Sequence, residues 1–142
     1  KMIERKVNSA KEMIELGEEL GRFIGGGVVI ELIGDVGAGK TTFTKGLAKS
    51  IGIADTIQSP TFTISRVYYG KKFSLTHYDF YRLNDAGIMK MELAESLADP
   101  QNITVVEWAE GLSDGLPPDR IKLTFENNGE NSRIVKIEGL KD

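Results

Sequence analysis

The stretch Gly34-Asp35-Val36-Gly37-Ala38-Gly39-Lys40-Thr41 decides the fold of this chain. It fits the pattern of a glycine, four free positions and then Gly-Lys-Ser/Thr, which is typical of a phosphate-binding loop. The apolar run at 28–33 predicts a strand entering this loop, and residues 42–49 predict a helix leaving it. Shuffled chains of this composition match the pattern about twice in a hundred. A chance match between a predicted strand and a predicted helix is much rarer still. The sequence therefore predicts a nucleoside triphosphate site.

Each part of this loop has a separate role in holding phosphate. The glycines let successive backbone N–H groups turn toward an anion, and the N-terminus of the following helix adds about half a positive charge. The Lys40 side chain can then reach the β- and γ-phosphates, and the Thr41 hydroxyl can bind Mg²⁺.

Length and composition limit the classes of protein that remain. With 142 residues, we expect one domain spanning 1–142. A hydrophobic fraction of 40% and a charged fraction of 27% are typical of a soluble globular protein. The net charge of −3 does not favour a surface that coats nucleic acid, and the absence of cysteine excludes disulfides. Because no apolar run approaches about 20 residues, we expect no membrane span and a cytoplasmic protein.

The N-terminal segment predicts a strand followed by a helix. Residues 2–7 alternate like a short strand whose Ile3 and Val7 face inward. A capping box at 9–12 predicts a helix that begins at Ala10. Apolar side chains at helical spacing mark the buried face of this helix: Met13, Leu16, Leu20, Phe23 and Ile24.

Two pairs of β-rich runs predict hairpins. Residues 62–69 and 73–80 are joined at Gly70, and residues 120–126 and 133–138 flank an Asn-Asn-Gly turn. A tight hairpin makes its two strands antiparallel, so the sheet is expected to be mixed. Between the hairpins, we expect a helix within 84–98 and a short buried strand at 103–106. The predicted fold class is α/β, a P-loop NTPase domain with a mixed sheet and a C-terminal hairpin.

Two carboxylates follow predicted strands, where a P-loop protein needs an acid for its metal ion. Asp79 follows Leu75-Thr76-His77-Tyr78 in the run at 73–80, and Glu107 follows the strand at 103–106. Either acid alone could be a solvated strand end. We favour Glu107 as the metal ligand because its strand is the more purely apolar, and we place Asp79 second.

Other side chains near these motifs have both a functional and a structural interpretation. Thr61 could close over the γ-phosphate or could be an ordinary turn hydroxyl. Trp108 is either a core residue or an aromatic contact at the rim of the site, and His77 is either a proton carrier or a satisfied strand histidine. Three arginines could neutralise phosphate charge, and the sequence does not choose among Arg66, Arg82 and Arg133.

Two other classes of P-loop protein are weighed against an ATPase. A regulatory GTP-binding protein would read guanine with Asn-Lys-x-Asp and carry Asp-x-x-Gly, and the chain has neither motif. A small-molecule kinase, the alternative function, would need an acceptor pocket and commonly an arginine-rich lid. The six arginines are scattered and no lid insertion is evident, so ATP hydrolysis is the preferred activity.

At this point the chain resembles the TsaE (YjeE-type) ATPases along nearly its whole length. Four blocks occur in the order and spacing of that family: Gly34 to Phe43, Ser59-Pro60-Thr61-Phe62-Thr63, His77-Tyr78-Asp79-Phe80-Tyr81-Arg82-Leu83 and Val106-Glu107-Trp108-Ala109-Glu110. The resemblance implies parallel strands flanked by antiparallel ones. It also implies a Mg²⁺-dependent ATPase needed to make threonylcarbamoyladenosine beside the anticodon of tRNA. Such proteins bind the TsaD–TsaB complex, and hydrolysis resets that complex without their transferring the threonylcarbamoyl group.

The resemblance also implies roles for individual residues. Thr41 and Glu107 match the family's Mg²⁺ contacts, and Arg133 lies where a nucleotide contact is expected. The ATP-phosphate segment corresponds to Gly37, Ala38, Gly39, Lys40, Thr41 and Thr42. With the assignments made above, the candidate catalytic residues are Lys40, Thr61, Asp79, Glu107 and Trp108. The tRNA is expected to be reached only through the complex.

Overall fold

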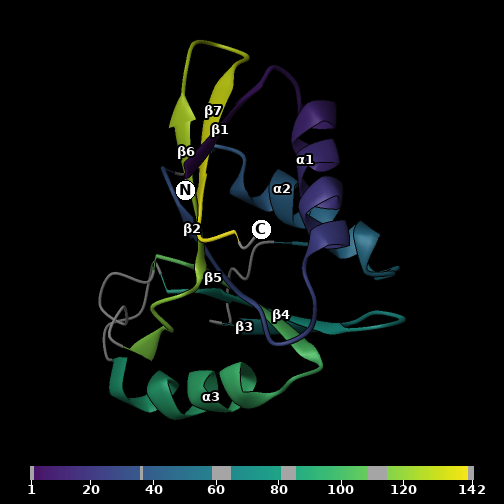
Figure 1. Ribbon diagram of the computed structural model, residues 1–142, viewed down its shortest axis with the longest axis vertical. Helices are drawn as coiled ribbons and strands as arrows, with labels where there is room; N and C mark the ends of the chain where they lie inside the picture. Colours follow the sequence, from purple (N-terminus) through teal and green to yellow (C-terminus); the bar gives the residue numbers. More distant parts are fainter. Residues whose placement is uncertain (1, 36, 59–64, 81–85, 109–114, 141–142) are drawn as a thin grey trace.

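A seven-stranded mixed sheet forms the centre of the computed structural model, which describes residues 2–35, 37–58, 65–80, 86–108 and 115–140 (Figure 1). The strand order across the sheet is β1-β7-β6-β2-β5-β4-β3. The strands are β1 (Met2–Val7), β2 (Val29–Ile33), β3 (Ser65–Tyr69), β4 (Ser74–Asp79), β5 (Asn102–Glu107), β6 (Ile121–Asn127) and β7 (Arg133–Glu138). The helices are α1 (Ala10–Phe23), α2 (Lys40–Ser50) and α3 (Ala86–Ala98).

The mixed sheet confirms the predicted fold class. Strands β6, β2, β5 and β4 are mutually parallel and form the centre. Antiparallel pairs flank them, with β3 against β4 on one side and β6–β7–β1 on the other. Both expected hairpins are present, and Gly129 in the second has φ 114°, a left-handed conformation that glycine adopts without strain. Residues 62–64 of the first expected strand lie outside the described residues.

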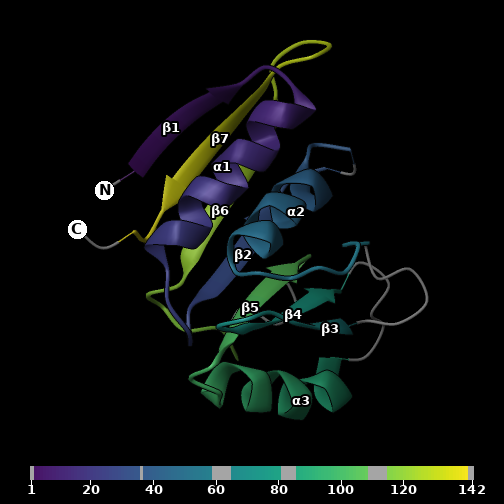
Figure 2. The same ribbon diagram turned by 90° about the vertical axis from the view of Figure 1, so that its right-hand side faces the viewer.

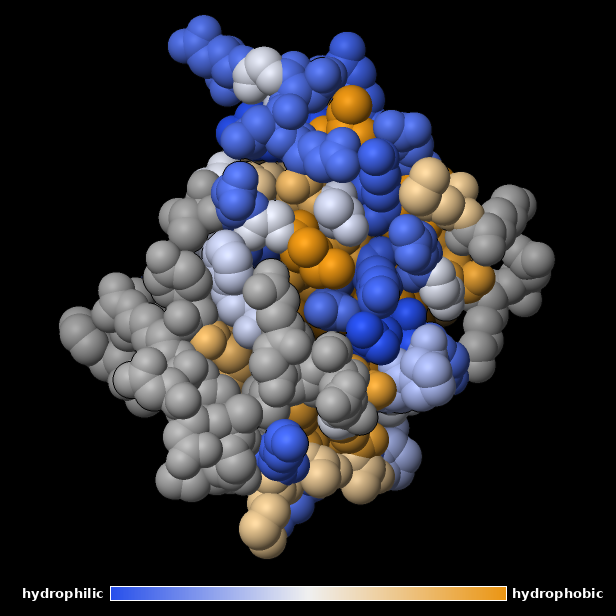
Figure 3. Space-filling model, turned by 90° about the vertical axis from the view of Figure 1, so that its left-hand side faces the viewer, coloured by the Kyte–Doolittle hydropathy of each residue, from blue (hydrophilic) through white to orange (hydrophobic). Residues whose placement is uncertain are grey.

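The helices divide unequally between the two faces of the sheet. Figures 1 and 2 show α1 and α2 together on one face, where the larger apolar core lies. On the other face, Leu93 and Leu97 of α3 pack against Val106 and neighbouring apolar side chains. Figure 3 shows hydrophilic side chains gathered at the end of the molecule that the β6–β7 hairpin forms. No helix in the described ranges is long and apolar enough to cross a membrane.

Polar contacts hold α3 to the sheet beside its two leucines. The Tyr78 hydroxyl lies 2.6 Å from the Ser96 hydroxyl and donates to the Glu92 carbonyl at 3.4 Å. Burial raises the pKa of Tyr78, so the neutral, donating form of this phenol is favoured. Asn102 of β5 adds a bond from its side-chain amide to the Ser96 carbonyl at 3.4 Å.

Helix α1 begins where the capping box predicts it. The N-cap Ser9 accepts a hydrogen bond from the Glu12 N–H at 3.1 Å, and the Glu12 carboxylate reaches back to the N–H of Asn8 at 2.9 Å. The predicted buried face is wrong at its last turn, because Phe23 is 80% exposed. The helical period continues past the point where the sheet offers cover, since β1 is an edge strand and its Ile3 is itself 37% exposed.

Helices α1 and α2 cross unusually closely because glycines meet backbone at the crossing. A Cβ added at Gly46 would lie 2.0 Å from the Ile14 carbonyl oxygen, and one added at Gly17 would lie 2.2 Å from the Phe43 carbonyl oxygen. No side chain separates the two backbones at these points. The crossing therefore fixes the position of α2, whose first residue is Lys40, relative to the N-terminal helix.

Candidate nucleotide-binding site

The loop between β2 and α2 has the backbone geometry of an anion site. Gly37 and Gly39 have φ values of 82° and 106°, in the left-handed region that side chains disfavour. Gly39 is the N-cap of α2 and brings no capping side chain, while the first helical bond joins the Phe43 N–H to its carbonyl at 2.9 Å. In the described part of the chain no side chain at the N-cap bonds the N–H groups of this first turn, which lie at the positive end of the helix.

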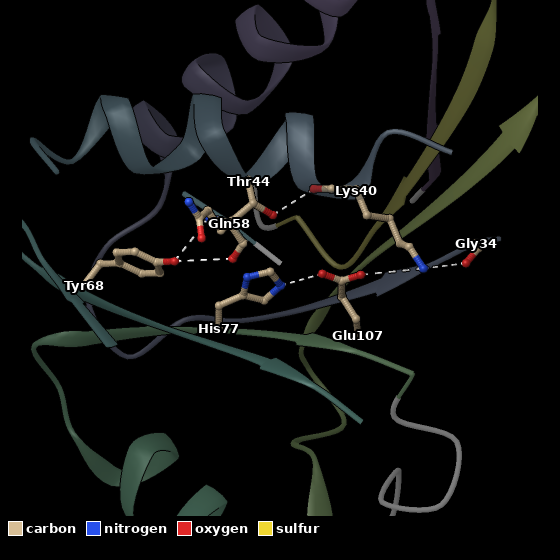
Figure 4. Close-up of polar contacts among 7 residues, drawn as sticks. All are labelled: Gly34, Lys40, Thr44, Gln58, Tyr68, His77 and Glu107. Carbon is tan, nitrogen blue, oxygen red and sulfur yellow. Dashed lines mark hydrogen bonds and ion pairs between the residues drawn. The ribbon is translucent and has the colours of Figure 1, made fainter. Parts of the chain in front are cut away.

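The Lys40 side chain is folded inward against three groups. It is 6% exposed, and its Nζ donates to the Gly34 carbonyl at 2.6 Å (Figure 4). The same ammonium lies 3.6 Å from Oε1 of Glu107 and 4.2 Å from the centre of the Trp108 ring. A carboxylate and an aromatic face are both favourable neighbours for a cation. The lysine charge is thus balanced inside the loop.

Glu107 ends β5, a strand whose six residues are all buried, as the apolar sequence at 103–106 led us to expect. The carboxylate itself is 3% exposed, and its second oxygen, Oε2, is hydrogen-bonded to Nε2 of His77. A buried carboxylate is tolerated when it is paired and hydrogen-bonded, and Glu107 has Lys40 on one oxygen and His77 on the other. The sequence favoured a satisfied strand histidine at position 77 and did not predict this contact.

Asp79 lies beside Glu107 on the neighbouring parallel strand. The two residues are register partners, so their side chains project from the same face of the sheet. The Phe80 N–H donates to the Glu107 carbonyl at 3.0 Å and continues the pairing by one residue. The structure therefore brings both predicted acids to the edge of the sheet where the loop lies.

Trp108 has the backbone conformation expected of a constrained position. Its φ is 57°, left-handed and uncommon for a residue with a side chain. The indole packs at the margin of the apolar cluster under α3, while Lys40 lies over its ring. Trp108 therefore lies at the margin of the apolar core and contacts the lysine of the loop, and its role in the site stays a prediction.

A pocket of about 490 Å³ adjoins the phosphate loop. Three segments line it, the loop with the first turn of α2, the start of α1, and the β6–β7 hairpin: Val7, Asn8, Ser9, Ala10, Met13, Gly37, Gly39, Thr42, Glu130, Asn131 and Arg133. Arg133 joins the hairpin to the loop, because its Nη2 donates to the Gly37 carbonyl at 3.4 Å. The capping box predicted where α1 begins, but no local pattern predicted that its first turn would line a pocket with the loop.

The remaining predicted residues divide into placed and unplaced ones. Arg66 lies on the edge strand β3 and contacts Gln58 at 3.5 Å, whereas Thr61 and Arg82 lie outside the described residues. Thr41 is half-buried in the first turn of α2. Among the described residues, no group of three or more histidine, cysteine or acidic side chains could hold a metal ion alone. A magnesium ion here would need ligands from the nucleotide, as is usual for Mg²⁺ in nucleotide sites.

A central parallel sheet, a glycine-rich loop between a strand and a helix, and a buried lysine and carboxylate at that loop define a nucleotide-binding protein of the P-loop class. Comparison with known proteins agrees. A family model described as "Threonylcarbamoyl adenosine biosynthesis protein TsaE" matches residues 7–135. The chain belongs to the TsaE family, whose role is in tRNA threonylcarbamoyladenosine biosynthesis.

Individual relatives support the same family. The tRNA threonylcarbamoyladenosine biosynthesis protein TsaE of Streptomyces coelicolor is 39% identical over 137 residues, covering 90% of each chain. The protein of the same name from Aquifex aeolicus is 36% identical over 133 residues, covering 92% of each. The crystal structure of Bacillus subtilis YdiB superposes with a TM-score of 0.76 at 29% identity, covering 96% of this chain and 84% of that one.

Proposed function

We propose that this protein binds ATP with Mg²⁺ and hydrolyses it, and that hydrolysis drives turnover of the TsaD–TsaB complex during threonylcarbamoyladenosine formation on tRNA. The observation that carries the proposal is the meeting of Lys40, Glu107 and Trp108 at the phosphate loop. The protein would work as one domain in the cytoplasm and reach tRNA only through the complex.

The nucleotide would be shared between the loop and its neighbouring pocket. The phosphates would accept hydrogen bonds from the backbone of Gly37 to Thr42, and the nucleoside would occupy the pocket that Arg133 lines. Lys40 would exchange the Gly34 carbonyl and Glu107 for phosphate oxygens. This exchange replaces one anionic partner of the lysine by another, so the ammonium never lacks a counter-charge.

The donor set fits a magnesium ion that arrives with the nucleotide. Thr41 offers a hydroxyl at the start of α2, and Glu107 offers Oε1, whose present partner is the lysine that would move. When bound, Mg²⁺ supplies charge neutralisation on the β- and γ-phosphates. We assign Asp79 to orienting the attacking water and Thr61 to closing over the γ-phosphate. Trp108 would shield the site from solvent.

Replacing Glu107 with alanine should separate metal-dependent turnover from nucleotide binding. Loss of a carboxylate that contacts the metal removes transition-state charge stabilisation, and we expect Mg²⁺-dependent hydrolysis to fall roughly 100-fold. Nucleotide binding in EDTA should change by no more than about threefold, which is under 1 kcal/mol. Phosphate release and calorimetric titration measure the two effects.

The matched control for this substitution is Glu15→Ala, which removes the same charge from an exposed position on α1. It should leave both quantities unchanged. An unaltered Mg²⁺ titration of the Glu107→Ala variant would remove Glu107 from the metal site.

The partner assignment is tested by a pull-down with purified TsaD–TsaB. We expect the complex to retain different amounts of this protein in the presence and in the absence of Mg-ATP. A coupling ATPase must bind its partner differently before and after hydrolysis, since a ligand with equal affinity for both states shifts nothing. Failure to bind the complex under either condition would contradict the proposed coupling.

A further inference from the structure

We propose that His77 is a positioning residue for Glu107. It would hold one carboxylate oxygen so that the other stays directed at the phosphate loop. The inference rests on the proposed function, because the other oxygen, Oε1, is the one assigned to the metal. His77 itself would touch neither nucleotide nor metal.

The first observation is the contrast between the burial of His77 and its hydrogen bonding. The side chain is completely buried in β4, on the face that also carries Leu75 into the main core. Its Nε2 is bonded to Oε2 of Glu107, and among the described residues Nδ1 has no hydrogen-bond partner. A buried polar atom without a partner costs free energy that an apolar side chain would avoid. Within the described part of the chain, the bond to Glu107 is therefore the feature that distinguishes this ring from a leucine at the same place.

That contact requires a proton on Nε2 of the ring. An ionised carboxylate can only accept hydrogen bonds, so the proton of a neutral imidazole must be on Nε2. In that neutral ring Nδ1 is the acceptor, and among the described residues it has no partner. Figure 4 shows this second nitrogen turned away from Glu107, toward the side where Gln58 lies. The ring is thus a donor to Glu107 in one defined tautomer.

The second observation is that the two oxygens of Glu107 have different neighbours. His77 is opposite Val105 in the parallel register, two residues before Glu107, so the carboxylate lies between the imidazole and Lys40. Oε2 is held by the imidazole inside the sheet, and Oε1 faces the Lys40 ammonium, which would leave when phosphate binds. After Lys40 has moved, the bond from His77 still restrains the carboxylate, with Oε1 toward the loop. Hydrogen bonds of this kind to ligating carboxylates typically change metal affinity or activity 10–100-fold when removed.

The test compares His77→Leu with His77→Gln. Leucine fills the space without a donor, whereas glutamine places an amide N–H near the position of Nε2. The readout is binding of a non-hydrolysable ATP analogue by calorimetry across a Mg²⁺ titration. We expect analogue binding by His77→Leu to need roughly 10–100-fold more Mg²⁺ to reach half of its Mg²⁺-dependent increase, with binding in EDTA unchanged. His77→Gln should recover most of the lost sensitivity to Mg²⁺. Leu75→Val controls for a packing defect on the same face of β4 and should retain the wild-type Mg²⁺ dependence.

A second readout, NMR of the histidine ring, does not depend on activity. Its signals can be assigned directly because the chain has a single histidine. Nitrogen-15 NMR of the wild-type protein should show one imidazole, protonated at Nε2 and bare at Nδ1, and Glu107→Ala should shift these signals. A ring protonated at Nδ1 alone would overturn the proposal.

The outcomes separate this inference from the proposed function. If wild-type binding of the analogue does not respond to Mg²⁺, the metal assignment of the site fails. If the wild type responds and folded His77→Leu responds identically, only the role of His77 is overturned. Should the leucine variant not fold, His77→Asn replaces it, because its amide is too short to reach Oε2. A wild-type Mg²⁺ dependence in His77→Asn would then contradict the proposal.

Discussion

Replacing Lys40 with alanine is expected to abolish Mg-ATP turnover, lowering the rate at least about 100-fold, while the protein remains folded. The ammonium would neutralise charge on the transferring phosphoryl group, and Thr41 beside it cannot replace a cation. In the structure the lysine is stored against Gly34, Glu107 and Trp108, ready for exchange with phosphate. Phosphate release measures the effect.

The fold of the Lys40→Ala variant should persist for a structural reason. Glu107 loses its ion pair but keeps the hydrogen bond to His77, so the buried carboxylate is not left without a partner. We expect a lower melting temperature and an unchanged circular dichroism spectrum. The matched control is Lys45→Ala, which removes the same charge from an exposed position on the same helix and should retain full turnover. Undiminished hydrolysis by the Lys40→Ala variant would show that the loop does not take part in ATP hydrolysis.

Replacing Gly46 with alanine is expected to destabilise the protein, although the same change in most helices stabilises it by up to about 1 kcal/mol. The new Cβ would lie 2.0 Å from the Ile14 carbonyl oxygen, and neither backbone can rotate away as a side chain could. Forcing packed elements apart typically costs about 1–3 kcal/mol, so the steric cost exceeds the gain in helix propensity. We expect the melting temperature to fall by roughly 5–10 °C.

Because α2 carries the phosphate loop at its N-terminus, the Gly46→Ala variant should also bind nucleotide more weakly. Thermal unfolding and calorimetry check both effects. Gly25→Ala is the control, since a Cβ there has no neighbour within 4 Å. A Gly46→Ala variant more stable than the wild type would show that the two helices do not cross as closely as the structure indicates.

The parts of the fold that the sequence predicted well are those with a local signal. The loop at 34–41 and the capping box at 9–12 are each encoded within a few consecutive residues, and both hairpins have turn-forming residues between their strands. Even so, helical spacing placed Phe23 in the core, because spacing does not reveal where the opposing sheet ends. Ile3, which the alternation of residues 2–7 placed inward, is exposed on an edge strand for the same reason.

The arrangement of the site depends on contacts between distant segments. The sequence located Asp79 and Glu107 at strand ends, but their pairing in register follows from the order of the parallel strands, which no local pattern encodes. Likewise, local patterns did not choose among the three arginines. The family resemblance pointed to Arg133, and the position of the β6–β7 hairpin brings this residue to Gly37. The bond between His77 and Glu107 spans 30 residues of sequence.

Phosphate release from Mg-ATP by the purified wild-type protein, with and without TsaD–TsaB, tests the central claim most directly. We expect slow, Mg²⁺-dependent hydrolysis by the protein alone and faster hydrolysis when the complex is present, with both lost in Lys40→Ala. No Mg²⁺-dependent release under either condition would contradict it. Rapid transfer of phosphate to an added metabolite would contradict it equally, and would indicate a small-molecule kinase.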